Sequence, residues 1–246
     1  MFVHLHCHSH YSFLRATAAP GELVAAAARE AMPAVALTDT DGLYAAIPFY
    51  QAAREAGIQP ILGAVLPVGE GERENFPLLL LAAGVEGYAN LCRLATHRQL
   101  DEHALAWSLL DTHRDGLIAL YVPDSFGTKR STPSQSGTGT CSAALQGGIA
   151  TSANEIPGRD AQSARISRLK EIFGENFYLE THHFPASGHA NLRAARTLGH
   201  ALGVPLVATN NVHFLAPGEF LHHRVVNAIR AGRLVSRIAP PEIADA

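Results

Sequence analysis

Short apolar segments of strand length alternate with longer amphipathic segments along most of the 246-residue chain. Seven segments are predicted to be strands, and they are residues 2–7, 34–38, 59–66, 77–83, 116–122, 177–181 and 204–208. Helices are predicted at residues 20–31, 43–56, 88–100, 103–113, 161–173, 190–202 and 219–231. Strands that alternate with helices favour a parallel α/β sheet, which is either closed into a barrel or open and doubly wound.

The positions of the polar residues favour the barrel. Polar clusters follow the carboxyl ends of the first, second, sixth and seventh predicted strands. A closed barrel gathers these strand ends around one mouth, whereas an open sheet spreads them out and has one crevice where its strand order reverses. We therefore expect an α/β fold with a seven-stranded barrel.

Composition narrows the class of protein. Apolar residues make up 47% of the chain and charged residues 17%, which fits a soluble globular protein. The net charge of −3 gives no overall basic field, so any binding of nucleic acid needs a local patch or parts of a larger protein. Three widely spaced cysteines (Cys7, Cys92 and Cys141) favour a reducing cytoplasm. No apolar run reaches the roughly 18 residues that cross a membrane.

Four of the 14 histidines lie within the first ten residues, at His4, His6, His8 and His10. Alternate side chains of an extended strand share a face, so these imidazoles would form a row on one side. Burying such a row without partners is costly, and neutral imidazole is a good ligand for zinc, manganese or iron. We predict a metal site with His6 and His8 as its main pair, in preference to a frayed terminus.

Three later clusters contain further candidate ligands. Asp39 follows the second predicted strand and is expected either to serve the metal site or to cap the next helix. Residues 180–183 (ETHH) end the sixth strand, and His183 is favoured because adjacent side chains point in opposite directions. Residues 209–213 (TNNVH) follow the seventh strand, from which His213 could close the site across the barrel.

The remaining histidines are predicted to lie on solvated helix faces. This set comprises His97, His103, His113, His200, His222 and His223. Cys7 falls on the strand face opposite the histidine row, so we expect a buried small residue there rather than a ligand. The chain contains neither a phosphate-binding loop with its lysine nor a Gly-x-Ser-x-Gly nucleophile elbow.

Six short motifs occur in a fixed order. They are HLHCHS at residues 4–9, YSFL at 11–14, LTD at 37–39, PILG at 60–63, YANLCRL at 88–94 and VATNNVH at 207–213. With them the chain resembles the PHP (polymerase and histidinol phosphatase) domain that opens the alpha subunit of bacterial DNA polymerase III. Residues 13–15 and 210–213 are more similar to the error-prone, translesion paralogue. The resemblance covers nearly the whole chain except residues 123–160.

The resemblance implies a distorted seven-stranded (β/α) barrel with up to three metal ions at its mouth, where active members hydrolyse phosphoesters. In some replicative polymerases the domain is a proofreading exonuclease, and in others it has lost its metals and serves as a scaffold. The family pattern assigns His6 and His8 to its His-x-His ligands. His213 matches the final histidine of the pattern, and His183 matches another ligand position.

The chain departs from this pattern at four positions. In the family pattern, an acidic ligand stands where this chain has Arg15, and a histidine stands where it has Thr40. An acidic residue stands where this chain has Asn211. Val65 replaces a glutamate that often bridges metals, and valine has no lone pair to offer. An arginine near the site adds positive charge that repels cations. These departures imply that the metal site is partly dismantled.

We therefore expect a PHP domain over residues 1–235, with an irregular surface insertion at 123–160 and a linker or tail at 236–246. We expect the domain to have a mainly structural role in DNA replication or repair. Its partners would be the rest of a polymerase chain or accessory proteins, and it would contact DNA only indirectly. The expected metal ligands are His6, His8, Asp39, His183 and His213, with reduced occupancy by zinc, manganese or iron. Two alternatives stay open: a self-standing metal-dependent phosphoesterase (phosphatase or 3′–5′ exonuclease), and an interaction module without a site.

Overall fold

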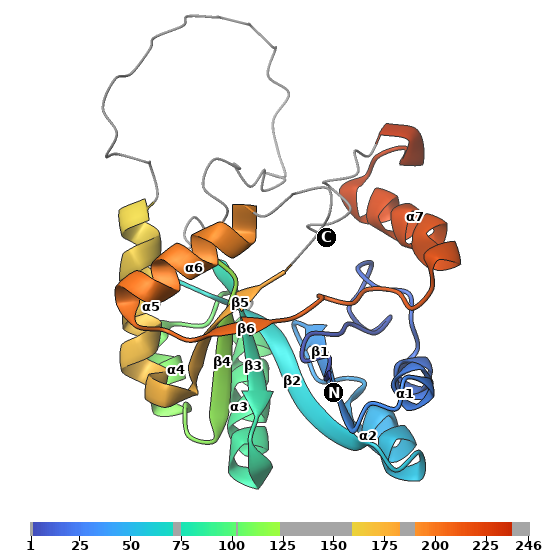
Figure 1. Cartoon of the computed structure of the whole chain (residues 1–246), viewed down its shortest axis with the longest axis horizontal. Coiled ribbons are helices and arrows are strands. Elements are labelled where there is room, and N and C mark those ends of the chain that lie inside the picture. Colours follow the sequence, from blue (N-terminus) through green and yellow to red (C-terminus); the bar gives the residue numbers. More distant parts are fainter. Residues whose placement is uncertain (1, 71–74, 102, 124–158, 183–189, 238–246) are drawn as a thin grey trace, which may run out of the picture.

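Six strands form one curled sheet in the order β1-β2-β3-β4-β5-β6 (Figure 1). The computed structural model describes residues 2–70, 75–101, 103–123, 159–182 and 190–237. The strands are β1 (Ala34–Thr40), β2 (Gln59–Val68), β3 (Phe76–Ala82), β4 (Leu117–Tyr121), β5 (Phe177–Thr181) and β6 (Leu206–Ala208). The helices are α1 (Pro20–Arg29), α2 (Ala46–Glu55), α3 (Gly84–Asp101), α4 (Trp107–Thr112), α5 (Arg159–Phe173), α6 (Ala190–Leu202) and α7 (Phe220–Ala231). Short 3-10 turns are η1 (Gly174–Asn176), η2 (Pro217–Glu219) and η3 (Val235–Arg237).

The sheet is mixed, so the expectation of a wholly parallel sheet is wrong. β1 and β2 are parallel, as are β4, β5 and β6, but β3 runs antiparallel to both of its neighbours. The reason is the short connection between β2 and β3, which covers residues 69–75 and has no room for a crossover helix. Parallel neighbours need a crossover of a dozen residues or more, whereas antiparallel neighbours need only a turn.

The first predicted strand, residues 2–7, is not a strand in the structure, so the described sheet has six strands and not seven. The segment instead lies extended between β1 and Val212, with one isolated parallel bridge from Cys7 to Val212. Its backbone hydrogen bonds are Ala36 N to His4 O (2.9 Å), Thr38 N to Cys7 O (2.8 Å), His8 N to Val212 O (2.8 Å) and Val212 N to His6 O (2.9 Å). These bonds join two parts of the sheet that are far apart in sequence.

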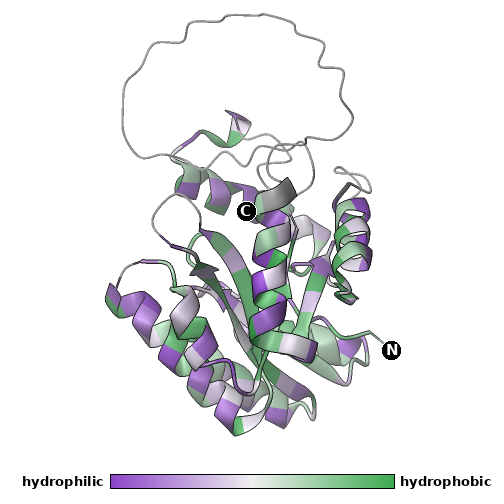
Figure 2. Cartoon of the chain, turned by 90° about the vertical axis from the view of Figure 1, so that its left-hand side faces the viewer, coloured by the Kyte–Doolittle hydropathy of each residue, from purple (hydrophilic) through white to green (hydrophobic). Residues whose placement is uncertain are grey.

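The largest apolar core lies between the sheet and helices α3 to α6. β3 shows the alternation that builds it: Leu78 and Leu80 are fully buried in this core, while Leu79 and Leu81 belong to a smaller cluster on the other face. In Figure 2 the helices around the strands carry both green (apolar) and purple (hydrophilic) residues. Each fully buried leucine contributes roughly 1.5–3 kcal/mol, so this layer holds the strands that carry the site.

A second core lies between β1 and the helices α1 and α2. It contains Leu23 and Ala27 of α1, Phe49 of α2, and Cys7, which is 1% exposed. The prediction of a buried, structural Cys7 is confirmed, and burial together with the Asp39 charge raises the pKa of its thiol to about 12. This core holds the histidine segment against β1. None of the helices that the structure describes combines the length and hydropathy needed to cross a bilayer.

Candidate metal centre

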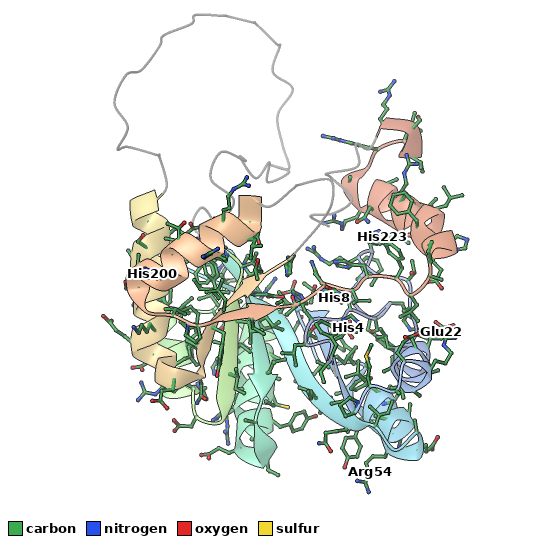
Figure 3. All side chains as sticks on the ribbon, in the orientation of Figure 1. His4, His8, Glu22, Arg54, His200 and His223 are labelled. Atoms are coloured by element: carbon green, nitrogen blue, oxygen red, sulfur yellow. The ribbon has the colours of Figure 1, made fainter. Side chains whose placement is uncertain are left out.

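The candidate site lies where the histidine segment meets the carboxyl ends of β5 and β6. His6 and His8 come from the segment, Glu180 from β5, and His182 directly follows β5. His213 follows β6 and stacks on the ring of His8, and Figure 3 shows His8 below the α7 residue His223. Residues from the beginning and the end of the chain therefore meet at one edge of the sheet.

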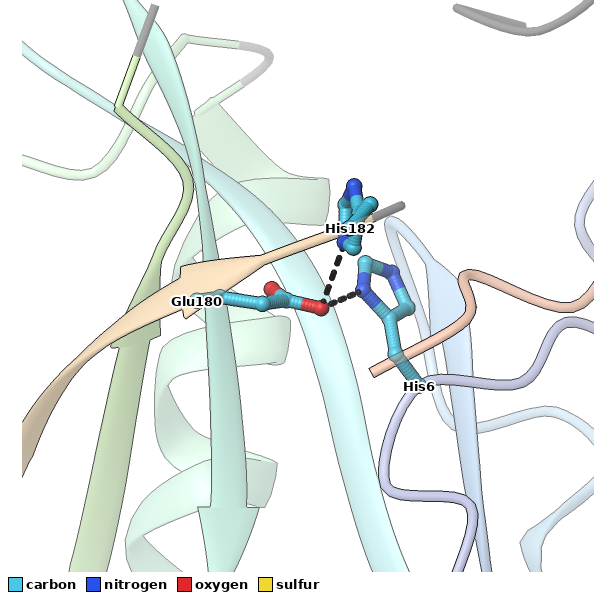
Figure 4. Close-up of side chains that lie close together, drawn as sticks. All are labelled: His6, Glu180 and His182. Atoms are coloured by element: carbon cyan, nitrogen blue, oxygen red, sulfur yellow. Dashed lines mark hydrogen bonds and ion pairs between the residues drawn. The ribbon is translucent and has the colours of Figure 1, made fainter. Parts of the chain in front are cut away.

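Glu180 organises one half of the site, which we call the carboxylate half: Glu180, His6, His182 and Thr209. The Glu180 side chain is fully buried, and its Oε1 accepts hydrogen bonds from His6 Nδ1 (2.6 Å) and His182 Nε2 (2.9 Å) (Figure 4). The Thr209 hydroxyl donates to the same oxygen. Three buried donors are thus satisfied by a single carboxylate oxygen.

The carboxylate stays ionised despite its burial. Burial by itself raises the pKa of Glu180, but the charge of His6 and the hydrogen bonds from His182 and His6 hold that pKa below its ordinary value. Its second oxygen, Oε2, is buried and has no hydrogen-bond partner among the described residues. Glu180 therefore carries a negative charge and one unused acceptor, which suits a cation.

The hydrogen bonds assign the tautomer of His6. Glu180 is ionised and can only accept, so His6 donates through Nδ1–H. In the neutral ring this leaves Nε2 with a free lone pair. A carboxylate behind a histidine is the usual arrangement that orients a metal ligand and increases its basicity.

His8 has the same tautomer for a different reason. The Ser12 hydroxyl has one proton and donates it to Asp39 Oδ1 (2.7 Å), so it must accept from His8 Nδ1 (3.0 Å). His8 Nε2 is therefore also a free lone pair. Asp39 additionally accepts from the backbone and hydroxyl of Ser9, both at 2.7 Å, and so fixes the loop that orients His8.

His6 Nε2 and His8 Nε2 lie 3.1 Å apart, at hydrogen-bond distance. Without a metal ion one nitrogen donates a proton to the other, because two bare lone pairs at that distance would repel unless a cation lay close to both. Two imidazoles on one tetrahedral zinc ion, each about 2.0–2.1 Å from it, would have their nitrogens roughly 3.3–3.4 Å apart. The observed pair fits a shared ion to within a few tenths of an ångström. By contrast, the distance of 2.6 Å between His6 Nδ1 and Glu180 Oε1 is too short for two ligands of one ion and fits a charge-assisted hydrogen bond.

His8 also begins the other half of the site, which we call the stacked half: His8, His213 and His223. The rings of His8 and His213 are parallel, with centroids 4.6 Å apart and planes at 9°, and His223 stacks on His213 at 5.3 Å. Neither ring nitrogen of His213 has a hydrogen-bond partner within the described part of the chain. The stack presents buried nitrogens without protein partners.

Burial keeps the stacked imidazoles neutral. It is the main reason that the pKa of His213 falls to about 3, and the neighbouring charge of His223 lowers it further. Burial likewise holds the pKa of His8 well below its ordinary value, with His213 and His6 as the next causes. Neutral rings are the form in which histidine binds metal.

α7 closes the stacked half, and this contradicts the prediction that His223 lies on a solvated face. His223 is 2% exposed, and its Nε2 lies 2.9 Å from the Arg15 carbonyl, to which it donates. Asn227, one turn later, is also buried and contacts the same imidazole. The spacing of His223 and Asn227 on one helix face was the available signal, because two polar residues at that spacing can form a buried polar stripe.

The structure brings together most of the predicted site residues, while their roles as ligands stay predictions. His6 and His8 are adjacent, and His213 stacks on His8. Asp39 lies within β1, and because the N-cap of α2 is Ala45, the helix-cap alternative is wrong. His183 falls outside the described residues. Sequence reasoning missed Glu180 and His182 as partners of His6, since the choice between adjacent histidines needed the strand's orientation.

Two of the departures from the family pattern lie opposite each other. Thr40, the last residue of β1, is paired with Val65 within β2. This pair offers one hydroxyl and no other ligand atom. Asn211 adopts a left-handed backbone with φ of 46°, a conformation that asparagine tolerates better than most residues.

A model of the family described as "PHP domain" matches residues 4–183. That match covers most of the chain, so the chain belongs to the PHP domain family. The predicted family is thereby confirmed.

The relatives of the chain are DNA polymerases. It is 39% identical to an error-prone DNA polymerase of Symbiobacterium thermophilum over 98% of its length, and 32% identical to the DNA polymerase III subunit alpha of Bacillus subtilis over 99%. The chain spans about a fifth of the length of these relatives, at 21% and 20%. The chain is therefore homologous to one region of a much longer polymerase.

The fold agrees with a solved structure from Bacteroides vulgatus, described as a two-domain protein containing a predicted PHP-like metal-dependent phosphoesterase. The alignment has a TM-score of 0.51 at 12% identity and covers 87% of this chain and 52% of the other. At this identity the similarity concerns the fold alone.

Proposed function

We propose that the chain is the PHP domain of an error-prone, alpha-type DNA polymerase of the cytoplasm, with a mainly structural role and a metal site reduced to a single divalent ion. The observation that carries this proposal is the pair of Nε2 atoms of His6 and His8, 3.1 Å apart, with Glu180 behind His6. Imidazole ligands suit zinc, manganese or iron. The domain is proposed to extend over residues 1–235.

The reduction of the site follows from its two sides. The Thr40–Val65 pair offers one weak ligand and one side chain that cannot coordinate, so no second ion is held there. Arg15 brings positive charge near the stacked half, and this charge contributes to the lowered pKa values of His8 and His213. When bound, a single ion would supply Lewis-acid polarisation of a phosphoryl oxygen. His6 and His8 would hold it and Glu180 would orient His6.

A structural role is supported by the outer face of α7. Leu221 and Ile229 are 59% and 62% exposed, and Val225 between them is 38% exposed. Their spacing of four residues forms an apolar stripe opposite the buried His223 face. We propose that the remainder of the polymerase chain, or an accessory protein, covers this stripe. The histidine segment beside β1 is proposed to act as the seventh wall of a distorted barrel.

Elemental analysis of the purified chain tests this proposal. We expect about one equivalent of zinc, manganese or iron in the wild type, its loss in the double variant His6→Ala/His8→Ala, and its retention in His200→Ala, which removes an exposed histidine of α6. Two or three equivalents would contradict a reduced site. Metal that persists in the double variant would contradict the assigned ligands.

A second function, a metal-dependent phosphoesterase, is favoured by one observation. His6, Glu180 and His182 place ligand atoms within 4.8 Å of one another and are all close to full burial. Release of nucleotides from a DNA 3′ end, or of phosphate from a small ester, would be measured with and without added metal. Metal-dependent hydrolysis that disappears in His6→Ala would establish this function in place of a mainly structural role.

A further inference from the structure

The corner of the molecule around α7 has an excess of positive charge. Residues 217–237 contain four arginines, Arg224, Arg230, Arg233 and Arg237, and one acidic residue, Glu219. The whole chain has a net charge of −3, so this corner is opposite in sign to the rest. The Glu219 carboxylate is used locally, since it accepts a hydrogen bond from the backbone of Leu215.

The positive charge continues to the candidate site through the inner face of α7. His223, Asn227 and Arg230 are spaced by four and three residues and therefore lie on one face of the helix. Arg230 donates to Asn227 Oδ1 (3.1 Å), and His223 donates to the Arg15 carbonyl (2.9 Å). Burial and then the positive charge of Arg15 lower the pKa of Arg230, as expected for neighbouring cations.

Three of the arginines of this corner, Arg15, Arg230 and Arg237, have no carboxylate at ion-pair distance among the described residues. The arginine–carboxylate ion pairs in that part of the chain join Arg98 to Asp41, Arg114 to Asp111 and Arg168 to Glu70. Asp41, whose charge also acts on Arg15, is thus already paired with Arg98. Neighbouring cations repel unless an anion lies between them, so this corner suits an external anion.

Exposed aromatic rings lie on the loop that carries Arg15. Phe13 is 80% exposed, and Tyr11 is 42% exposed and stacked against His10 at 4.7 Å. A basic surface with exposed aromatic faces is the usual combination for single-stranded nucleic acid, because arginines contact phosphates while bases stack on the rings. An acidic protein segment would use the arginines but would leave Phe13 without a function.

We propose that Arg15 and Arg230, together with Arg237 in the turn that follows α7, form a surface that binds the phosphate backbone of single-stranded DNA, and that Phe13 provides a stacking face for a base. Arg230, Asn227 and His223 connect this surface along α7 to Arg15 and the stacked half of the site. This inference rests on the proposed role in a DNA polymerase, and it replaces an indirect relation to DNA with direct contact.

Fluorescence anisotropy with a labelled oligothymidine of about 12 nucleotides tests the surface. The experiment uses the purified chain in EDTA, so metal plays no part in the outcome. Arg230→Glu/Arg237→Glu is expected to weaken binding at least tenfold. The control Arg54→Glu/Arg193→Glu makes the same change of charge on exposed residues of α2 and α6 and should weaken binding less than twofold.

Two further measurements specify the contacts. In Arg230→Ala/Arg237→Ala, the slope of log K against log salt should become shallower by about 1.4, because each lost phosphate contact on a single strand contributes about 0.7. Phe13→Ala should weaken binding by about tenfold, the effect expected for one stacked base. An unchanged salt slope would overturn the assignment of phosphate contacts.

Three results would overturn the proposal: no oligonucleotide binding at about 50 mM salt, equal weakening in the two charge-reversal pairs, or tighter binding of polyglutamate of the same length. The last would identify an acidic protein partner.

His6→Ala/His8→Ala should bind the oligonucleotide like the wild type. Metal loss with retained DNA binding, or the reverse, would separate a failure of the proposed metal site from a failure of this surface.

Discussion

The two halves of the site use histidine in opposite ways. In the carboxylate half, one buried oxygen of Glu180 accepts from three donors, and the geometry of every donor is fixed by a hydrogen bond. In the stacked half, neither ring nitrogen of His213 has a hydrogen bond to a described residue, and the ring is positioned by contacts with His8 and His223. One half is held by directed polar interactions and the other by packing.

This difference shows which half tolerates change. Removing the acceptor of a buried network leaves several polar groups unpaired, which is costly. Replacing a ring whose nitrogens are already unpaired removes no hydrogen bond. The departures from the family pattern at Arg15 and Asn211 lie near the stacked half, while in the carboxylate half Glu180 Oε1 has three donors.

The largest expected effect is loss of the Glu180 acceptor. Glu180→Ala should lower the free energy of unfolding by about 3–5 kcal/mol, because three buried donors lose their partner. Urea denaturation in EDTA measures this, with Glu175→Ala, an exposed glutamate five residues earlier, as the control. A loss below about 1 kcal/mol would mean that the carboxylate half is not an integrated network.

The next effect concerns metal affinity. Glu180→Gln keeps the shape of the side chain but removes the charge that orients His6. It should weaken metal binding by about 10–100-fold, the usual effect of losing a partner that orients a metal ligand. His223→Gln, in the stacked half, should weaken it only a few-fold. Competition with a chromophoric chelator measures both. Equal losses would remove the distinction between the halves.

The pH dependence of stability should separate the halves in the metal-free protein. The folded pKa values of His8 and His213 lie below 6.5, so the unfolded chain binds protons more readily as the pH falls. Stability is therefore full above pH 6.5 and decreases below it, by up to about 1.4 kcal/mol per pH unit for each imidazole. Glu180, whose pKa is also lowered, loses its contribution only below its ordinary value of 4.5.

Urea denaturation between pH 6.5 and 4.5 measures the imidazole contribution. His213→Phe removes one of these titrating rings and should make the decrease in stability shallower by up to about 1.4 kcal/mol per pH unit. The wild type and the variant should run parallel only below about pH 3, where His213 is protonated in the folded protein as well. An unchanged slope in the variant would show that His213 is not the buried neutral group described above.

The smallest expected effect is that of His213→Phe on stability at neutral pH. The phenyl ring preserves the contacts with His8 and His223, and no hydrogen bond is lost. The free energy of unfolding should change by less than about 1.5 kcal/mol, as for other shape-conserving core substitutions. His213→Ala, which leaves a cavity between two rings, serves as the comparison and should cost about 2–4 kcal/mol.

Much of the fold was predictable from the sequence. The seven helices lie within a few residues of the predicted ranges because their apolar spacing is regular, and six of the seven predicted strands are present. The direction of β3 was not predicted, since apolar pattern does not encode strand direction. The first segment was predicted as a strand from its alternation, yet it pairs through isolated backbone bonds.

The site was predictable only in part. His6 and His8 share a face through the period of an extended chain, so their pairing followed from local pattern. Glu180 and His223 take part in the site through long-range hydrogen bonds. Glu180 is 174 positions away from its partner His6, and His223 is 208 positions away from its partner Arg15. Local periodicity carries no information about such contacts, and an isolated histidine in a helix is most often solvated.

The separation of these partners along the chain has a consequence for biosynthesis. The histidine segment leaves the ribosome before its partners do, because Glu180 is 174 positions after His6 and Val212 is more than 200 positions after it. At roughly 5–20 residues per second, the wait for Val212 is roughly 10–40 seconds. For most of that interval His6 and His8 lie on a nascent chain that does not yet contain Glu180. Binding of metal at the complete site would therefore have to follow the synthesis of β5 and β6.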